Sequence, residues 1–370
     1  MNTQIALPGR RNVANWAVIL VSLLMALVLA WLLSRVLPLD LIDFQHYDQA
    51  SYLIWRGQNP YGVVEFFAPP WLAIFLLPLL PLPIKVASAL WVMVCLASIG
   101  ASAVLAQQWL DAPRRSWGRL ASLVFMLLAP AALFVYITGQ LSALVVLAAL
   151  VAGGQFIHPG QPPRRWLLAV ALAVTTVKPN IVWLPAVLAG LQVARQRDWH
   201  AAAACAGVLG LLAAISFVWL PDWPAALFEA WRGGAYRGGV GLVAAGYVGL
   251  SELGVPGWIW GPLLAYVFWQ WWREGLSVRV LALAFAAGLL VTPYSRSYDQ
   301  VMLILPTMAC LASAGGFKRW LSIALMTLAW IVPLLALPVL APVFASMAML
   351  LAFPALPSTV NMPKSVADNV

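Results

Sequence analysis

The chain has 370 residues, of which 63% are hydrophobic and only 9% are charged. So few charges cannot cover the water-facing surface of a soluble protein of this length, so a soluble multidomain enzyme is excluded. The net charge is +9, but no basic tract interleaved with aromatic residues occurs. Membrane lipids are therefore expected partners, and nucleic acid is not.

Uncharged stretches of membrane length recur along the chain. The two longest are residues 120–163 and 320–363. As single helices they would each extend about 66 Å at ~1.5 Å per residue, roughly twice the ~30 Å hydrocarbon core of a bilayer. Each must therefore fold back as a helical hairpin, and the whole chain is predicted to be an all-α polytopic membrane protein.

The charges between the apolar runs predict the topology. Arg10 and Arg11 precede an uncharged run that is too long for a cleaved signal peptide, so we expect a retained first span with its N-terminus inside. Residues 66–84 are apolar but contain five prolines, which disfavour a continuous helix. If this run spans the membrane, 7 of the 21 positive charges lie inside; if it does not, 14 do. The positive-inside rule therefore predicts that residues 69–83 form a re-entrant or surface segment on the outer face.

With that choice the sequence predicts about twelve spans in one domain over residues 1–354. They run near 14–34, 86–108, 118–137, 140–157, 166–178, 180–194, 199–219, 257–272, 279–293, 300–315, 320–336 and 338–354. The long outer loops are 35–68 and 220–256, and residues 355–370 are predicted to be a disordered tail. Function is therefore expected on the outer face.

Acidic residues gather in the first outer loop. Asp40, Asp43, Asp48 and Glu65 lie there with His46, and the surrounding sequence predicts a short helix that ends at Gly57. Two interpretations are open at this point. The carboxylates either solvate the loop and cap the helix, or they carry chemistry.

Several ordered motifs resemble glycosyltransferase family 87. They are DLIDFQHYDQASYLIWRGQNPYG in the first loop, APPWLAIFLLPLLPLP after it, TGQLSALVVL at 138–147, VKPN at 177–180 and TPYSRSYDQVMLILP at 292–306. The resemblance covers most of the chain from residue 14 to about 315. It implies a GT-C-type helical bundle that uses a polyprenyl-phosphate-linked sugar, typically mannose.

The resemblance also implies a catalytic Asp in the first outer loop. The D-x-x-x-Y spacing of the family falls on Asp43 and Tyr47. Family members of phosphatidylinositol mannoside synthesis carry a His in the late motif, where this chain has Tyr298 followed by Asp299. This departure bears on the acceptor more than on the reaction.

The chemistry of such a transfer indicates which other side chains are needed. A lipid phosphate leaves as a stable anion, so one general base suffices, and we expect Asp43 to serve as it. Cations should hold the departing phosphate. The candidates on the outer face are Lys178, Arg296, Arg232 and Arg237; the full predicted substrate-binding set is His46, Tyr47, Asp48, Lys178, Arg296, Tyr298 and Asp299. In the alternatives, Lys178 snorkels at a helix end and Arg296 pairs with Asp299.

No cofactor is expected. The sequence has no DxD string, no glycine-rich phosphate loop and no HExxH motif, so a nucleotide-activated donor is not predicted. A divalent cation shared by Asp40, Asp43 and Asp48 is possible but not expected. Most Trp residues are predicted to form an interfacial belt, and sugar stacking by Trp71 is the alternative for that residue.

Together these features predict an inverting hexosyltransferase in the cytoplasmic membrane. It would move a hexose, with mannose favoured, from a polyprenyl-phosphate donor to a lipid or glycan acceptor at the outer face. A polytopic lipid or solute transporter or flippase is the rival. Such proteins usually show paired repeats and ionisable groups near mid-span, which the sequence lacks.

Overall fold

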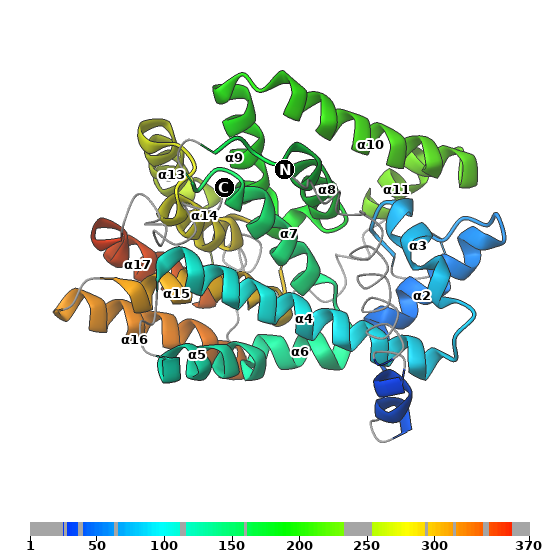
Figure 1. Ribbon diagram of the computed structural model, residues 1–370, viewed down its shortest axis with the longest axis horizontal. Coiled ribbons are helices and arrows are strands. Elements are labelled where there is room, and N and C mark those ends of the chain that lie inside the picture. Colours follow the sequence, from blue (N-terminus) through cyan, green and yellow to red (C-terminus); the bar gives the residue numbers. More distant parts are fainter. Residues whose placement is uncertain are drawn as a thin grey trace, which may run out of the picture.

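The computed structural model describes residues 25, 28–35, 40–62, 66–111, 116–158, 161–232, 254–292, 295–313, 316–335 and 340–356, and the regular elements among these residues are all helices, with no β-strand. Figure 1 shows the arrangement. The α-helices are α2 (Ile42–Trp55), α3 (Pro70–Leu76), α4 (Ile84–Leu110), α5 (Ser116–Leu128), α6 (Pro130–Thr138), α7 (Ser142–Gly154), α8 (Arg165–Thr175), α9 (Pro179–Gln196), α10 (Trp199–Trp219), α11 (Trp223–Arg232), α13 (Gly261–Glu274), α14 (Val278–Val291), α15 (Ile304–Ala312), α16 (Phe317–Ile331) and α17 (Ala341–Ala352). The 3-10 helices are η1 (Leu77–Leu79), η2 (Gly257–Trp260), η3 (Ser297–Leu303), η4 (Val332–Leu335) and η6 (Phe353–Ala355).

Three of the described helices are long and apolar enough to cross a membrane. They are α4, α10 and the continuous segment Phe317–Leu334. Shorter apolar helices, including α7, α8, α14 and α17, lie within other predicted spans. The prediction of a helical membrane protein is confirmed, while the number of twelve spans stays a prediction. Most of the first predicted span, part of the loop 220–256 and residues 357–370 of the tail lie outside the described residues.

One predicted span is broken. Residues 118–137 were expected to form a single helix, but α5 and α6 meet at an angle of 45° around Ala129. Pro130 begins α6, and a proline at this position cannot donate the backbone hydrogen bond that would continue α5. The bend directs α6 towards η3, against which it packs.

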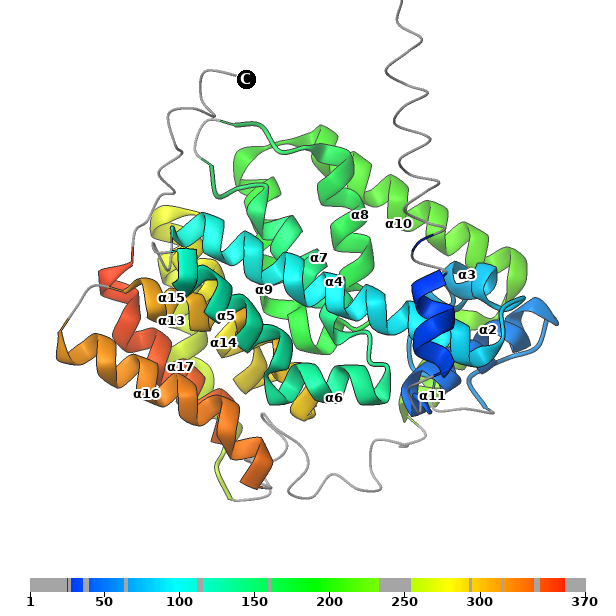
Figure 2. The ribbon, with the colours of Figure 1, turned by 60° about the horizontal axis from the view of Figure 1, so that its bottom comes forward.

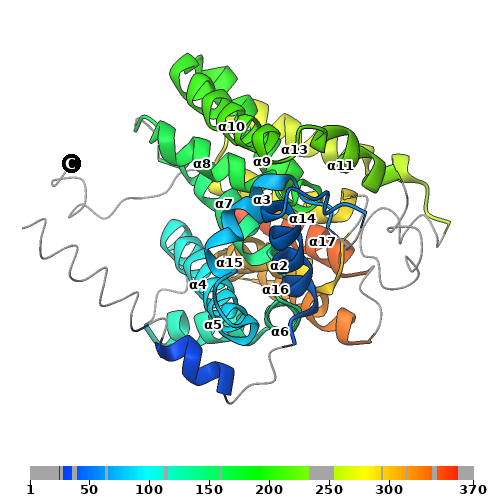
Figure 3. The same ribbon diagram turned by 90° about the vertical axis from the view of Figure 1, so that its right-hand side faces the viewer.

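The proline-rich segment forms two short helices, α3 and η1, between α2 and α4. Seven residues of α-helix are only about 10 Å long, so α3 cannot cross a bilayer. Its Leu72, Ala73 and Leu76 are buried, and α3 packs against α2 and α10. Figures 2 and 3 both show α2 and α3 beside the end of α10 and next to α11.

The most buried helix is α14. Its residues from Val278 to Leu290 are buried except Arg279, and it contacts α9, α13, α15 and α17. A helix that is apolar on every side is stable only when neighbours cover all its faces. In contrast, α10 has only Ala201 and Ser216 buried, so its apolar surface is on the outside of the helical body.

Candidate active site

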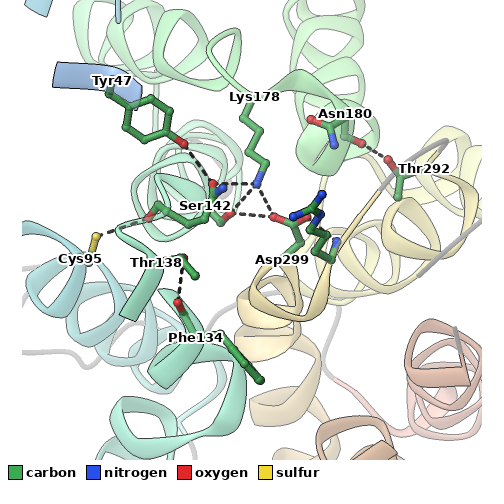
Figure 4. Close-up of polar contacts among 11 residues, drawn as sticks. Tyr47, Cys95, Phe134, Thr138, Ser142, Lys178, Asn180, Thr292 and Asp299 are labelled. Atoms are coloured by element: carbon green, nitrogen blue, oxygen red, sulfur yellow. Dashed lines mark hydrogen bonds and ion pairs between the residues drawn. The ribbon is translucent and has the colours of Figure 1, made fainter. Parts of the chain in front are cut away.

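Three turns that are distant in sequence meet in one cluster of polar contacts (Figure 4). Residues 139–142 connect α6 to α7, Lys178 precedes α9, and residues 296–299 begin η3. The Lys178 Nζ lies 2.6 Å from Asp299 Oδ1, 2.8 Å from Ser142 Oγ and 3.1 Å from Gln140 Oε1. It also lies 4.5 Å from the centroid of the Tyr298 ring, in a cation–π contact. We call Gln140, Ser142, Lys178, Tyr298 and Asp299 the lysine cluster.

The ion pair at the centre of the lysine cluster is almost completely shielded from solvent. The side chain of Lys178 is 14% exposed and that of Asp299 is fully buried. An ammonium group has three donors, and Lys178 uses all three on Asp299, Ser142 and Gln140. Asp299 Oδ1 also accepts from the Ser142 hydroxyl, and Oδ2 accepts from the backbone N–H of Arg296. The buried charges are therefore paired and hydrogen bonded, which is the condition for keeping them inside.

Local sequence explains why these turns have the shapes they do. Gly139 ends α6 with a φ of +76°, a conformation that L-residues with a side chain rarely adopt. Pro179 occupies the first turn of α9, where its missing N–H costs nothing, so the helix begins directly after Lys178. Asp299 lies in the first turn of η3 and its carboxylate accepts the N–H of Arg296, which fixes the start of that helix.

The acidic helix predicted in the first outer loop is α2, and it touches the lysine cluster. The Tyr47 hydroxyl donates to Gln140 Oε1 at 3.2 Å, and the Phe44 and Tyr47 rings pack against Trp91 of α4. Asp43 lies one helical turn before Tyr47 and is half-buried, without a hydrogen bond or ion pair to any residue that the structure describes. Its carboxylate therefore lies on the same face of α2 as the Tyr47 ring.

The structure brings some predicted residues together and leaves others apart. Tyr47, Lys178, Tyr298 and Asp299 contact one another directly or through Gln140. Arg296 has an exposed side chain at the start of η3, and its contact with Asp299 runs through the backbone N–H. The sequence left open an alternative in which Asp299 pairs with Arg296. In the structure the ion pair of Asp299 is with Lys178.

The remaining acidic-loop residues line α2 without reaching the lysine cluster. His46 and Asp48 are half-buried, and burial raises the pKa of the Asp48 carboxyl above its ordinary value. Asp40 is exposed at the start of the helix. Across the described part of the chain, no group of three or more His, Cys, Asp and Glu side chains is placed to hold a metal ion, and whether the protein uses one stays a prediction.

The other two candidate cations are Arg232 and Arg237. Arg232 is exposed at the end of α11 and lies over the Phe228 ring. Arg237 and the acidic residue Glu65 lie outside the described residues.

Sequence reasoning assigned no role to Gln140 and Ser142, although it used the TGQLS motif as part of the resemblance. A signal was present. These are polar residues around a glycine in the middle of a 44-residue stretch without charge, where a polar cluster is costly unless it has partners. Their partners are 36 to 157 residues away, so only the fold reveals them.

Comparison with known protein families identifies the family of this chain. A model of glycosyltransferase family 87 matches residues 66–314. The chain belongs to glycosyltransferase family 87. No curated protein and no solved structure matches the chain. The family identifies the chain as a glycosyltransferase and gives no support to the rival transporter function, and the apolar helices indicate a membrane protein.

The match to family 87 contains the whole lysine cluster but begins after α2. Residues 140–142, 178 and 298–299 lie within the matched region, and Asp43 and Tyr47 lie before it. The placement of α2 beside the lysine cluster therefore depends on the Tyr47–Gln140 contact and on the packing of α2 against α3 and α4.

Proposed function

We propose that this protein transfers a hexose, with mannose as the favoured sugar, from a polyprenyl-phosphate donor to a lipid or glycan acceptor at the outer face of the cytoplasmic membrane. The observation that carries the proposal is the contact between the acidic helix α2 and the lysine cluster. It brings the helix that carries the Asp43 carboxylate into contact with a cluster that contains the Lys178 ammonium, in a member of a glycosyltransferase family. A transfer from a lipid phosphate needs both kinds of group.

Asp43 acts as the general base in this proposal. The acceptor hydroxyl oxygen attacks C1 of the sugar, the bond from C1 to the phosphate oxygen breaks, and the hydroxyl proton passes to the Asp43 carboxylate. The polyprenyl phosphate leaves as an anion, so no second carboxylic acid is required to protonate it. Attack opposite the leaving group gives inversion at C1.

Arg296 and Lys178 are the proposed cations for the donor phosphate. Arg296 is exposed beside Asp299, whose carboxylate fixes its backbone. Lys178 has no spare donor in this structure, so a phosphate oxygen would have to replace the hydroxyl of Ser142 or the amide of Gln140. His46, Tyr47, Asp48 and Tyr298 complete the proposed substrate-binding surface, with Asp299 holding Lys178 in place.

The test uses the purified full chain in lipid nanodiscs with polyprenyl-phosphomannose as donor and a mixed membrane-lipid extract as acceptor. Asp43→Asn should lower turnover by at least about a hundredfold, the contribution typical of a general base. Asp40→Asn is the matched control, since it makes the same change at an exposed position three residues earlier, just before α2. Equal turnover by the wild type and Asp43→Asn would remove Asp43 as the base.

Donor binding tests the cations separately from the chemistry. Arg296→Ala and Lys178→Ala should each weaken binding of the lipid-linked donor, because each removes a charge-assisted contact to the phosphate. Unchanged affinity in both variants would reject the phosphate role.

We also propose that the transfer needs no cofactor or metal ion. The support is chemical, because the leaving group is already a stable anion and the sequence lacks the DxD string typical of metal-bound nucleotide sugars. Turnover should therefore be the same with and without EDTA. A loss that added Mg²⁺ or Mn²⁺ restores would contradict this.

A further inference from the structure

The amide oxygen of Gln140 connects α2 to the buried ion pair. Gln140 is 6% exposed, and its Oε1 accepts from Tyr47 at 3.2 Å and from Lys178 at 3.1 Å. A carbonyl oxygen has two lone pairs, so both donors are accommodated at once. The chain of contacts runs from α2 through Tyr47 and Gln140 to Lys178 and then to Asp299.

The backbone that carries Gln140 is held from a third helix. The Gly139 carbonyl accepts from the Trp91 indole N–H at 2.7 Å, and the Gln140 carbonyl accepts from the Cys95 thiol at 3.5 Å. Trp91 and Cys95 both belong to α4 and are buried. Gln140 is therefore anchored by a membrane-length helix, which makes its side chain a fixed reference point for α2.

We propose that Gln140 is a positioning residue, which sets the location of Asp43 relative to the lysine cluster by accepting the Tyr47 hydrogen bond. This inference rests on the proposed function. Tyr47 and Asp43 are four residues apart on one face of α2, with Cβ atoms about 6 Å from each other, so the bond at Tyr47 fixes the rotation and depth of α2 at Asp43. Small misplacements of a catalytic group cost large factors in rate.

Kinetics of single and double variants test the role. Tyr47→Phe should lower kcat about tenfold, a larger factor than any rise in the donor KM, since Lys178 keeps its three contacts. Gln140→Met should lower kcat at least as much, and the double variant should be no slower than Gln140→Met alone, because the two changes break one bond. Gln140→Glu keeps an oxygen that accepts from both donors, so it should recover part of the lost kcat.

Tyr61→Phe is the matched control. Tyr61 is also a buried tyrosine after α2, and its hydroxyl donates to the Ala68 carbonyl, away from the lysine cluster. Its effect on kcat should simply add to that of Gln140→Met. Additive effects of Tyr47→Phe and Gln140→Met would overturn the proposal.

Hydrogen exchange separates this inference from the proposed function. Backbone amides of residues 42–55 should exchange faster in Tyr47→Phe and in Gln140→Met than in the wild type and in Tyr61→Phe, whether or not a donor is present. Unchanged exchange, or faster exchange with unchanged kcat, would overturn the positioning role. The wild type could instead show no turnover with the donor while the two variants still exchange faster. That result would overturn the proposed function but not the positioning of α2 by Gln140.

Discussion

Lys178 and Asp299 are the least exposed of the four ion pairs that the described residues form. Removing one partner leaves the other charge buried and uncompensated, whereas replacing both with apolar groups removes the desolvation cost as well. The pair therefore holds three turns together only while both members are present. This distinguishes it from the exposed pair Arg119–Asp111, which water screens.

We predict that Lys178→Met or Asp299→Leu alone destabilises the protein by about 3–5 kcal/mol, and that the double variant recovers most of this loss. Thermal unfolding in detergent measures the effect. Arg119→Met is the control and should cost less than about 1 kcal/mol. Equal destabilisation by Lys178→Met and Arg119→Met would show that the buried pair carries no special weight.

The partly buried position of Asp48 predicts that the stability of the protein depends on pH. Burial raises its pKa in the folded protein above the ordinary value of 3.8, so the folded state binds this proton more tightly than the unfolded state does. The neutral carboxyl is favourable at low pH, and its contribution is lost as the pH rises through the folded pKa. Asp48→Asn should therefore raise the unfolding temperature at pH 7, with a gain that disappears below about pH 4. The exposed Asp40→Asn controls for the change in charge, and a gain at pH 7 no larger than its gain would contradict the burial effect.

At the scale of the element, α2 and the turn after α6 approach so closely that no side chain fits between them. A Cβ added to Gly139 would lie 2.7 Å from the Phe44 Cβ and 3.0 Å from the Leu41 Cβ. The glycine thus serves both the left-handed backbone and the contact with α2. Without it, the Tyr47 hydroxyl could not reach Gln140 at the present depth.

Gly139→Ala should therefore be more harmful than an alanine at a glycine with the same backbone conformation. Gly57 has a φ of +68° but open space around its Cβ position, so Gly57→Ala should cost only the backbone term, about 1–2 kcal/mol. Gly139→Ala adds the collision with α2 and should also lower kcat. Thermal unfolding measures the stability of both variants. An equal loss would show that α2 moves away from the added methyl group without further loss of stability.

The same elements show what the sequence can and cannot predict. Charge scarcity predicts α4 and α10, and proline content predicts that residues 69–83 form no continuous spanning helix, because these signals are local. The break between α5 and α6 also has a local cause, Pro130, and could have been found by the same rule. The lysine cluster could be predicted only in part. The resemblance indicates Lys178 and Asp299, but their pairing spans 121 residues, and the link through Gln140 depends on how α2 packs.

On the scale of the whole molecule, the ion pairs outside the lysine cluster join the ends of helices. Arg119–Asp111 joins α5 to the residue after α4, Arg165–Asp198 joins the start of α8 to the residue before α10, and Arg279–Glu274 joins the start of α14 to the end of α13. Along the chain, a helix separates each turn of the lysine cluster from the nearest of these pairs. Figure 1 shows α2, α3 and α11 at one end of the body and α13, α16 and α17 towards the other.

At the end of the body that carries these ion pairs, five exposed tryptophans lie beside basic residues. Trp117, Trp166, Trp199, Trp272 and Trp320 are 67–79% exposed. Each lies at a helix terminus within a few residues of an arginine or lysine. Tryptophan favours the membrane–water interface, and short loops rich in arginine and lysine favour the cytoplasmic side. The expected orientation therefore has this end inside and α2 outside.

Labelling of single cysteines tests that orientation in intact cells. Cys95 and Cys310 are buried and Cys205 is half-buried, so a chain with all three replaced gives the background. Gln58 follows α2 and Gln161 precedes α8, and both are exposed. Gln58→Cys should react with a membrane-impermeant maleimide added outside, whereas Gln161→Cys should react only after the membrane is opened. If only Gln161→Cys reacts from outside, the predicted orientation is wrong. The lysine cluster and α2 then lie on the cytoplasmic side, and the acceptor must be a cytoplasmic lipid or glycan.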